Sequence, residues 1–231
     1  MPSNRKLGDV ARRDLFRMAA GLGLGLGLGA SLGSPRQAPA QSALTPDEAL
    51  KLLMDGNGRF VAGRLTSSHA DPRLLAQKTA QKQEPFAAVL SCADSRVPVE
   101  LIFDQTIGHV FVTRLAGNVA TPEVIASLEY GAAVLGTRVI MVLGHAACGA
   151  VMAAIAGKAV PGQISALYAP LRAAVEQAGP DPDAAIRANA RIQGGILRSA
   201  SPVIADLSAQ GKIKVVAAHY DLASGAVTLL G

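Results

Sequence analysis

The segment on which the fold depends runs Val89-Leu90-Ser91-Cys92-Ala93-Asp94-Ser95-Arg96-Val97-Pro98. An apolar run from Phe86 to Leu90 leads into it, and such a run is typical of a buried strand. Cys92 is one of only two cysteines in the 231-residue chain, and it comes directly after this run. The sequence therefore predicts a buried strand that ends in a thiol.

The second cysteine follows a similar run. Val139 to Leu143 is apolar, and His145 and Cys148 come directly after it. If the two strands are parallel neighbours, Cys92, His145 and Cys148 meet at the carboxyl edge of the sheet. Two thiolates and one imidazole suit Zn²⁺ and leave a fourth position for water. The cysteines could instead be buried apolar residues or a disulfide, but a histidine three residues before Cys148 favours a metal.

These residues carry a family resemblance. Cys-x-Asp-Ser-Arg at 92–96 and Gly-His-x-x-Cys-Gly at 144–149 resemble the signature of the β-class carbonic anhydrases, and in further positions the plant-type subclass. The similarity extends from about Leu44 to the C-terminus and includes Tyr220-Asp221-Leu222 and Gly225. It implies an enzyme with one Zn²⁺ per chain. That enzyme interconverts carbon dioxide with bicarbonate and a proton through a zinc-bound hydroxide.

The resemblance also implies roles for two residues beyond the ligands. In the family, the aspartate matching Asp94 accepts a hydrogen bond from the zinc-bound hydroxide and orients it toward carbon dioxide. The arginine matching Arg96 pairs with that carboxylate, which should lower its pKa. In some relatives the aspartate instead becomes a fourth zinc ligand and closes the site, and the sequence leaves both arrangements open. Without the neighbouring ligand, an Asp-x-Arg pair would be an ordinary surface ion pair.

Three further positions match the plant-type subclass. Gln83, nine residues before Cys92, matches a glutamine that hydrogen-bonds substrate or product across the dimer interface. Phe111 and Tyr130 match the apolar pocket wall and a tyrosine of that subclass. Gln83 could also be an ordinary helix-end glutamine, and both aromatic residues could simply belong to the core. His69, His109 and His219 lack ligand-like spacing and are predicted to be surface or structural residues.

The chain departs from the family pattern in two places near these motifs. Ala146 follows the zinc histidine, where many relatives have serine. Ala116 stands where plant-type relatives have valine, and Arg114-Leu115 replaces the commoner Arg-Asn. These differences predict a wider pocket and leave the metal ligands untouched.

The first 40 residues predict an export signal that is removed. Arg12-Arg13 and the apolar residues after them are typical of a twin-arginine signal, and Ala38-Pro39-Ala40 fits a cleavage site. An uncleaved anchor is disfavoured because the Gly/Leu stretch between them is rich in glycine and short of the ~20 residues that a spanning helix needs. The prediction is a periplasmic domain of residues 41–231, with no stable membrane insertion after cleavage. The leader holds four of the five net positive charges, so the domain carries no evident nucleic-acid surface.

The pattern along residues 41–231 predicts an α/β fold with a mostly parallel sheet flanked by helices. Strands are expected at 86–90, 109–113, 139–143, 213–218 and 226–230. Helices are expected at 45–61, 72–82, 99–103, 121–135, 149–156, 164–177, 183–199 and 202–210. Thr45 and Glu48 form a capping box, while Gly56 and Gly58 weaken the first helix. The family lays this helix across a partner subunit, so we expect a homodimer or tetramer and no role for the helix in its own core.

Three functions compete at this stage. The first is reversible hydration of carbon dioxide. The second is hydrolysis of CS₂ or COS by the same zinc site, which would require a narrow apolar access route. The third is a non-catalytic protein that binds zinc or bicarbonate. An intact Asp94–Arg96 pair argues against the third, because a structural zinc site has no use for an oriented hydroxide.

Overall fold

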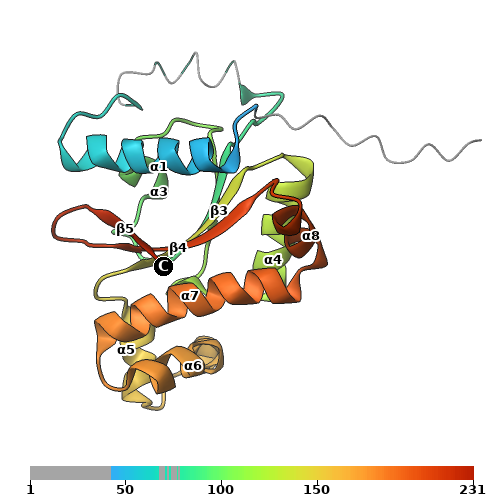
Figure 1. Cartoon of the computed structure of the whole chain (residues 1–231). Helices are drawn as coiled ribbons and strands as arrows, with labels where there is room; N and C mark the ends of the chain where they lie inside the picture. Colours follow the sequence, from blue (N-terminus) through green and yellow to red (C-terminus); the bar gives the residue numbers. More distant parts are fainter. Residues whose placement is uncertain (1–42, 68–70, 72, 74–76, 78) are drawn as a thin grey trace, which may run out of the picture. The chain divides into compact units, whose positions relative to one another are not determined.

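A computed structural model describes residues 43–231 apart from 68–70, 72, 74–76 and 78 (Figure 1). All of the described residues belong to one unit, residues 37–231. The predicted export signal and cleavage site lie outside the described residues, and so does part of the helix predicted at 72–82. Among the helices that are described, none has the length and apolar character needed to cross a membrane.

A five-stranded sheet forms the centre of this unit, in the order β2-β1-β3-β4-β5. Its strands are β1 (Ala87–Ser91), β2 (Val110–Arg114), β3 (Val139–His145), β4 (Lys214–Tyr220) and β5 (Val227–Leu230). The first four are parallel, and β5 pairs antiparallel with β4 at the edge. Every residue of β1 and β3 is buried, as expected of parallel strands covered on both faces. The predicted fold class is confirmed.

Helices cover both faces of the sheet. The α-helices are α1 (Pro46–Val61), α3 (Val99–Ile102), α4 (Pro122–Glu129), α5 (Gly149–Ala156), α6 (Tyr168–Ala178), α7 (Pro182–Ala200) and α8 (Pro202–Ala209). One apolar cluster joins α1 and α3 to the sheet, and a second joins α4, α7 and α8 to it. Figure 1 shows α1 and α3 on one side of the strands and α7 on the other, with α5 and α6 beyond α7.

Helix α1 packs on the core of its own chain. The predicted capping box is present, because the Thr45 hydroxyl accepts from the Glu48 N–H and the Glu48 carboxylate accepts from the Thr45 N–H. Ala49 and Leu53 are fully buried in the first apolar cluster. The expectation that this helix has no part in its own core is therefore wrong. Its apolar face already has a partner in the same chain.

The two glycines of α1 differ in their surroundings. A Cβ on Gly56 would lie 1.9 Å from the carbonyl oxygen of Phe103, so only glycine permits this close approach of α1 to the end of α3. Nothing lies within 4 Å of a Cβ on Gly58. Gly58 therefore weakens the helix as predicted, whereas Gly56 is required by tertiary packing.

Two further helical predictions hold with local changes. The helix predicted at 121–135 is α4 followed by a π-helix, η3 (Tyr130–Val134). The helix predicted at 164–177 begins with a 3₁₀ helix, η4 (Gly162–Leu167), before α6. A Cβ on Gly131 would lie 3.2 Å from the ring of Phe111, so η3 approaches strand β2 closely at this glycine.

Candidate metal centre

The strand register brings the three predicted ligands together. Strands β1 and β3 are parallel neighbours with Ser91 opposite Leu143, so both end at the same edge of the sheet. Cys92 follows β1, His145 ends β3, and Cys148 is the residue before α5. Their three ligand atoms all lie within 4.8 Å of one another, and all three residues are buried. One metal ion can therefore contact all three.

The turn between His145 and Cys148 is a tight one. The N–H of Ala146 donates to the carbonyl of Tyr220, which holds the end of β3 against β4 at 2.9 Å. Ala147 then has φ +53°, a left-handed conformation that reverses the chain toward α5. This turn explains how the side chains of His145 and Cys148, three residues apart in the sequence, can face the same metal ion.

His145 presents one nitrogen to the site. Its Nδ1 lies 2.9 Å from the carbonyl oxygen of Ala146, so Nδ1 carries the proton and donates it. Its Nε2 is buried and has no hydrogen-bond partner. An acceptor nitrogen that is buried and unpaired is rare unless it binds something, and here it faces two thiols. The chemistry of the donor set and this unpaired nitrogen fit Zn²⁺.

The two cysteines are free thiols that interact with each other. The interaction of Cys92 with Cys148 and, to a smaller extent, with His145 lowers the pKa of Cys92 to about 4, and the N–H groups of Asp94 and Gly117 add to this by donating to its sulfur. The same interaction and burial raise the pKa of Cys148. Cysteines bind a metal as thiolates, so two neighbouring sulfurs with a lowered pKa on one of them suit a cation. The disulfide alternative has no support in the structure.

Asp94 is held beside these ligands by Arg96. The Arg96 side chain donates from Nε to Oδ1 at 2.9 Å and from Nη2 to Oδ2 at 2.7 Å, and its backbone N–H also donates to Oδ1. These bonds from Arg96 hold the pKa of the Asp94 carboxyl well below its usual value. Oδ2 lies 4.0 Å from Nε2 of His145. The pair therefore lies directly beside the candidate ligands.

Arg114 fixes the loop that carries Asp94, and the sequence analysis assigned it no role. It ends β2 opposite Ser91. Its Nε donates to the carbonyl of Cys92 at 2.9 Å, and its Nη2 donates to the carbonyl of Asp94. The available clue was its position at the end of the strand next to β1, where its long side chain can reach the neighbouring loop.

A buried polar network supports the other side of Cys92. Gly117, with φ +75°, donates its N–H to the Cys92 sulfur at 3.4 Å. Its carbonyl accepts from Asn189 of α7 at 2.8 Å, and Gln193 donates to the Asn189 amide oxygen at 3.0 Å. Both polar side chains are buried. Sequence reasoning missed them, although two polar residues four apart on the apolar face of a helix predict a buried network.

Comparison with known proteins identifies the family. A family model described as carbonic anhydrase matches residues 87–227. The solved β-carbonic anhydrase CafA of Aspergillus fumigatus is 26% identical, with a TM-score of 0.63 over 80% of this chain and 89% of that chain. The chain belongs to the β-class carbonic anhydrase family.

Two curated carbonic anhydrases show how far the similarity reaches. Carbonic anhydrase 2 of Mycobacterium tuberculosis is 49% identical over 48% of this chain and 53% of its own length. The carbonic anhydrase of Pseudomonas aeruginosa is 34% identical over 68% of this chain and 78% of its own length. The match thus spans about half the length of the Mycobacterium tuberculosis protein and 78% of the length of the Pseudomonas aeruginosa protein.

The structure places the remaining predicted β-carbonic anhydrase residues away from this cluster. Gln83 and Tyr130 line one surface pocket of about 510 Å³, and the rings of Tyr130 and Phe111 lie 6.3 Å apart. That pocket contains none of the three metal ligands or Asp94. Within the described part of one chain, these three residues therefore gather with one another and not at the metal centre.

The histidines outside the centre have structural surroundings. His219 is buried, and its Nε2 lies 3.1 Å from the carboxylate of Asp183. Nδ1 of His109 lies 3.3 Å from the Thr106 hydroxyl. Both agree with the predicted structural or surface role, and His69 lies outside the described residues.

Proposed function

We propose that this protein catalyses the reversible hydration of carbon dioxide to bicarbonate and a proton. The observation that carries the proposal is the Asp94 carboxylate, bound at both oxygens by Arg96 while Oδ2 lies 4.0 Å from Nε2 of His145. A structural zinc site needs no such carboxylate. A hydration enzyme needs an acceptor that orients reacting water.

Each residue of the centre has a part in this reaction. Cys92, His145 and Cys148 would hold one Zn²⁺ per chain, and the unpaired Nε2 would be the histidine ligand atom. The ion would supply Lewis acidity and make water acidic enough to react near neutral pH. Asp94 would accept a hydrogen bond from the reacting water and direct an oxygen lone pair at carbon dioxide. Arg96 keeps that carboxylate ionised and binds both of its oxygens, which would leave the fourth position of the metal to water.

The test is a direct assay of the zinc-loaded protein. Carbon dioxide hydration is followed by stopped flow with a pH indicator, and CS₂ and COS hydrolysis are measured on the same preparation. We expect rapid hydration and slow or no sulfide release. Release of sulfide from CS₂ or COS at a higher kcat/KM than hydration would replace the proposed substrate. A zinc-replete protein with no activity on all three would leave only the non-catalytic alternative.

We further propose that the active protein is a homodimer or tetramer. Residues Gln83, Phe111 and Tyr130 match a substrate-side pocket of the plant-type subclass, and they gather with one another at the surface, where Tyr130 is 47% exposed. Helix α1 can still contact a partner through exposed Leu52 and Val61. In this assembly Gln83 would serve the metal centre of the neighbouring copy. An active monomer by light scattering would contradict the proposal.

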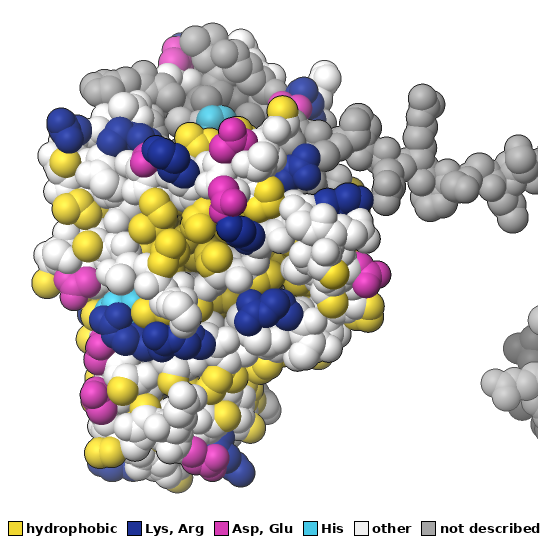
Figure 2. Space-filling model, viewed as in Figure 1, with side chains coloured by type: hydrophobic (Ala, Val, Ile, Leu, Met, Phe, Trp, Pro, Cys, Tyr) yellow, Lys and Arg dark blue, Asp and Glu magenta, His cyan; other side chains and the backbone are white. Residues whose placement is uncertain are grey.

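The edge of the sheet adds support for association. Figure 2 shows hydrophobic side chains gathered on the face between α1 and α7. Strand β5 is the edge strand there, and Leu229 is 41% exposed. A soluble protein seldom leaves an apolar edge strand without a cover, and a second copy is one such cover.

The proposed compartment is the periplasm. Its support is the sequence of residues 1–40, with Arg12-Arg13 before an apolar stretch and a small-residue cleavage site. A reporter fused to residues 1–45 should be exported through the twin-arginine route and should stay in the cytoplasm when both arginines are replaced by lysine. Export of the double variant at the original level would contradict this assignment.

A further inference from the structure

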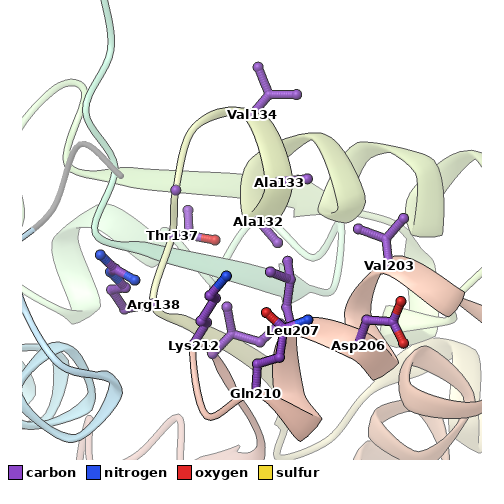
Figure 3. A pocket seen from close by; sticks show the side chains of 12 residues that line it. Ala132, Ala133, Val134, Thr137, Arg138, Val203, Asp206, Leu207, Gln210 and Lys212 are labelled. Atoms are coloured by element: carbon purple, nitrogen blue, oxygen red, sulfur yellow. The ribbon is translucent and has the colours of Figure 1, made fainter. Parts of the chain in front are cut away.

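A second pocket lies at the opposite end of the sheet from the metal centre. It has a volume of about 540 Å³ and is bounded by η3, the link from η3 to β3, and α8 with the turn that follows it (Figure 3). Its lining residues Arg138 and Ile213 directly precede strands β3 and β4. Cys92 and His145 lie at the carboxyl ends of strands in the same sheet. The pocket therefore lies outside the centre already described.

Hydrogen bonds fix the walls of this pocket. The Ser201 hydroxyl, at the start of α8, donates to the carboxylate of Glu129 at 2.5 Å and ties α8 to the end of α4. The N–H of Thr137 donates to the carbonyl of Gly131 at 3.0 Å, and the N–H of Leu135 donates to the carbonyl of Tyr130 at 3.1 Å. The second of these spans five residues and makes η3 a π-helix, a geometry often found at functional sites. The cavity is thus preformed.

Thr137 supplies a hydroxyl that has no partner in the fold. The residue is 1% exposed, and its Oγ1 is buried without a hydrogen bond. Figure 3 shows this hydroxyl directed into the pocket, toward the side of Lys212. Native proteins leave few buried hydroxyls unpaired, and a ligand is one explanation of such a group. A hydroxyl beside a lysine is suited to donate to an anionic oxygen.

The other lining residues include two basic side chains, one carboxylate and several apolar side chains. Lys212 and Arg138 line the pocket with one carboxylate, Asp206, and Figure 3 shows Asp206 on the far side of Lys212 from Arg138. None of the ion pairs found among the described residues involves Lys212, and its amine extends toward Thr137 in the same view. The apolar part of the lining includes Ala132, Leu207 and Ile213.

We propose that this pocket binds a small organic carboxylate with a short alkyl chain. The carboxylate accepts a hydrogen bond from the Thr137 hydroxyl and pairs with the Lys212 amine. The alkyl chain packs on Ala132, Leu207 and Ile213, where water would otherwise contact apolar surface. The site does not depend on the proposed hydration activity, because none of its residues belongs to the metal centre.

Butyrate is a suitable probe, and butyramide is its neutral control. The zinc-loaded full-length protein is titrated with each, and the dissociation constant is measured by ligand-observed NMR. Three variants are compared with the parent: Thr137→Val, Lys212→Gln and the exposed control Lys158→Gln. Thr137→Val keeps the side-chain shape and removes the unpaired hydroxyl, so the fold should be retained.

We expect butyrate to bind the parent and Lys158→Gln equally, and Thr137→Val and Lys212→Gln to weaken binding about tenfold each, as loss of a hydrogen bond to a charged group does. Butyramide should bind at least tenfold more weakly than butyrate. Equal butyrate affinity in all four proteins would place the ligand elsewhere, including at the metal centre, and would overturn the proposal. Equal affinity for butyramide, or no binding of butyrate, would do the same.

Discussion

Asp94 and Asp104 both have a lowered pKa, but the two carboxylates lie in different surroundings. Each is held by an arginine, and the pKa of each carboxyl lies well below its usual value. Hydrogen bonds from Arg96 lower the pKa of Asp94 against a smaller effect of burial. Burial would raise the pKa of Asp104, but hydrogen bonds from Ser67, Arg59 and Thr66 outweigh it.

The difference lies in what each carboxylate faces. Asp104 accepts from Arg59, from the N–H and hydroxyl of Thr66 and from the N–H of Ser67, and its side chain is fully buried. These bonds tie the last turn of α1 and the residues after it to the end of α3. Beyond Arg96, the Asp94 carboxylate faces His145, whose Nε2 lies 4.0 Å from Oδ2. A depressed pKa therefore does not by itself mark a catalytic carboxylate. The neighbouring candidate metal ligands are what distinguish Asp94.

Removing a ligand gives the largest expected effect, because it removes what Asp94 faces. In Cys148→Ser the soft thiolate is replaced by a hydroxyl that does not ionise near neutral pH, and the site has no spare ligand among the described residues. Zinc content should fall from one ion per chain to near zero, measured by metal analysis of the purified protein. Asp104→Asn, prepared in the same way, should keep its zinc. Full zinc in Cys148→Ser would contradict the ligand assignment.

Exchanging each aspartate for asparagine tests the comparison directly. Asp94→Asn should retain zinc and lose carbon dioxide hydration by about a hundred- to a thousandfold, the usual effect of losing one oriented hydrogen bond in an active site, or ~2.7–4 kcal/mol. An amide can present a donor where the reacting water needs an acceptor. Asp104→Asn should keep kcat and lose stability instead.

Near-normal turnover in zinc-replete Asp94→Asn would remove this residue from the mechanism. Zinc content and kinetics are measured on the same samples, so loss of metal is not mistaken for loss of chemistry. If Asp104→Asn also lost turnover while folded, the division between the two aspartates would be wrong.

The contrast between Asp94 and Asp104 shows which residues the sequence can predict. Cys92, His145, Cys148 and Asp94 were predicted because short motifs follow strands whose apolar runs are local and easily recognised. The capping box of α1 was predicted for the same reason, since both of its members lie within four residues.

Asp104 was not predicted, because its partners are 37 to 45 residues away. Arg114 and Asn189 were missed for a similar reason, since their contacts depend on strand order and on the packing of α7. The place of α1 on its own core was predicted incorrectly, because the family resemblance suggested a partner and the amphipathic pattern alone does not say which surface a helix covers. Tertiary contacts, not local patterns, decide such positions.

The pH dependence of the folding stability gives a further test of the structural role of Asp104. Its pKa is lower when the protein is folded than the ~3.9 of an unfolded aspartate, so the unfolded state binds more protons as the pH falls through this region. The stability that Asp104 contributes is therefore present above about pH 4 and is lost as the pH falls toward its folded value. Urea unfolding at pH 6 should show the parent more stable than Asp104→Asn, and the difference should shrink at pH 3. A difference that is equal at both pH values would mean that the charge of Asp104 is not what stabilises the fold.

The smallest effect is expected from removing one donor of the Asp104 cluster. The Thr66 hydroxyl donates to Oδ2 at 2.7 Å, while the Thr66 N–H donates to the same carboxylate and survives any substitution of the side chain. Thr66→Val should therefore lower the free energy of unfolding by only about 1 kcal/mol, because the carboxylate keeps its bonds from Arg59 and Ser67. Turnover should not change, since no hydrogen bond or ion pair joins this cluster to the metal centre within the described residues. Urea unfolding and hydration kinetics on one preparation measure both quantities. A tenfold fall in kcat at unchanged zinc content would show that the two aspartate regions are coupled, and the comparison would then have to be given up.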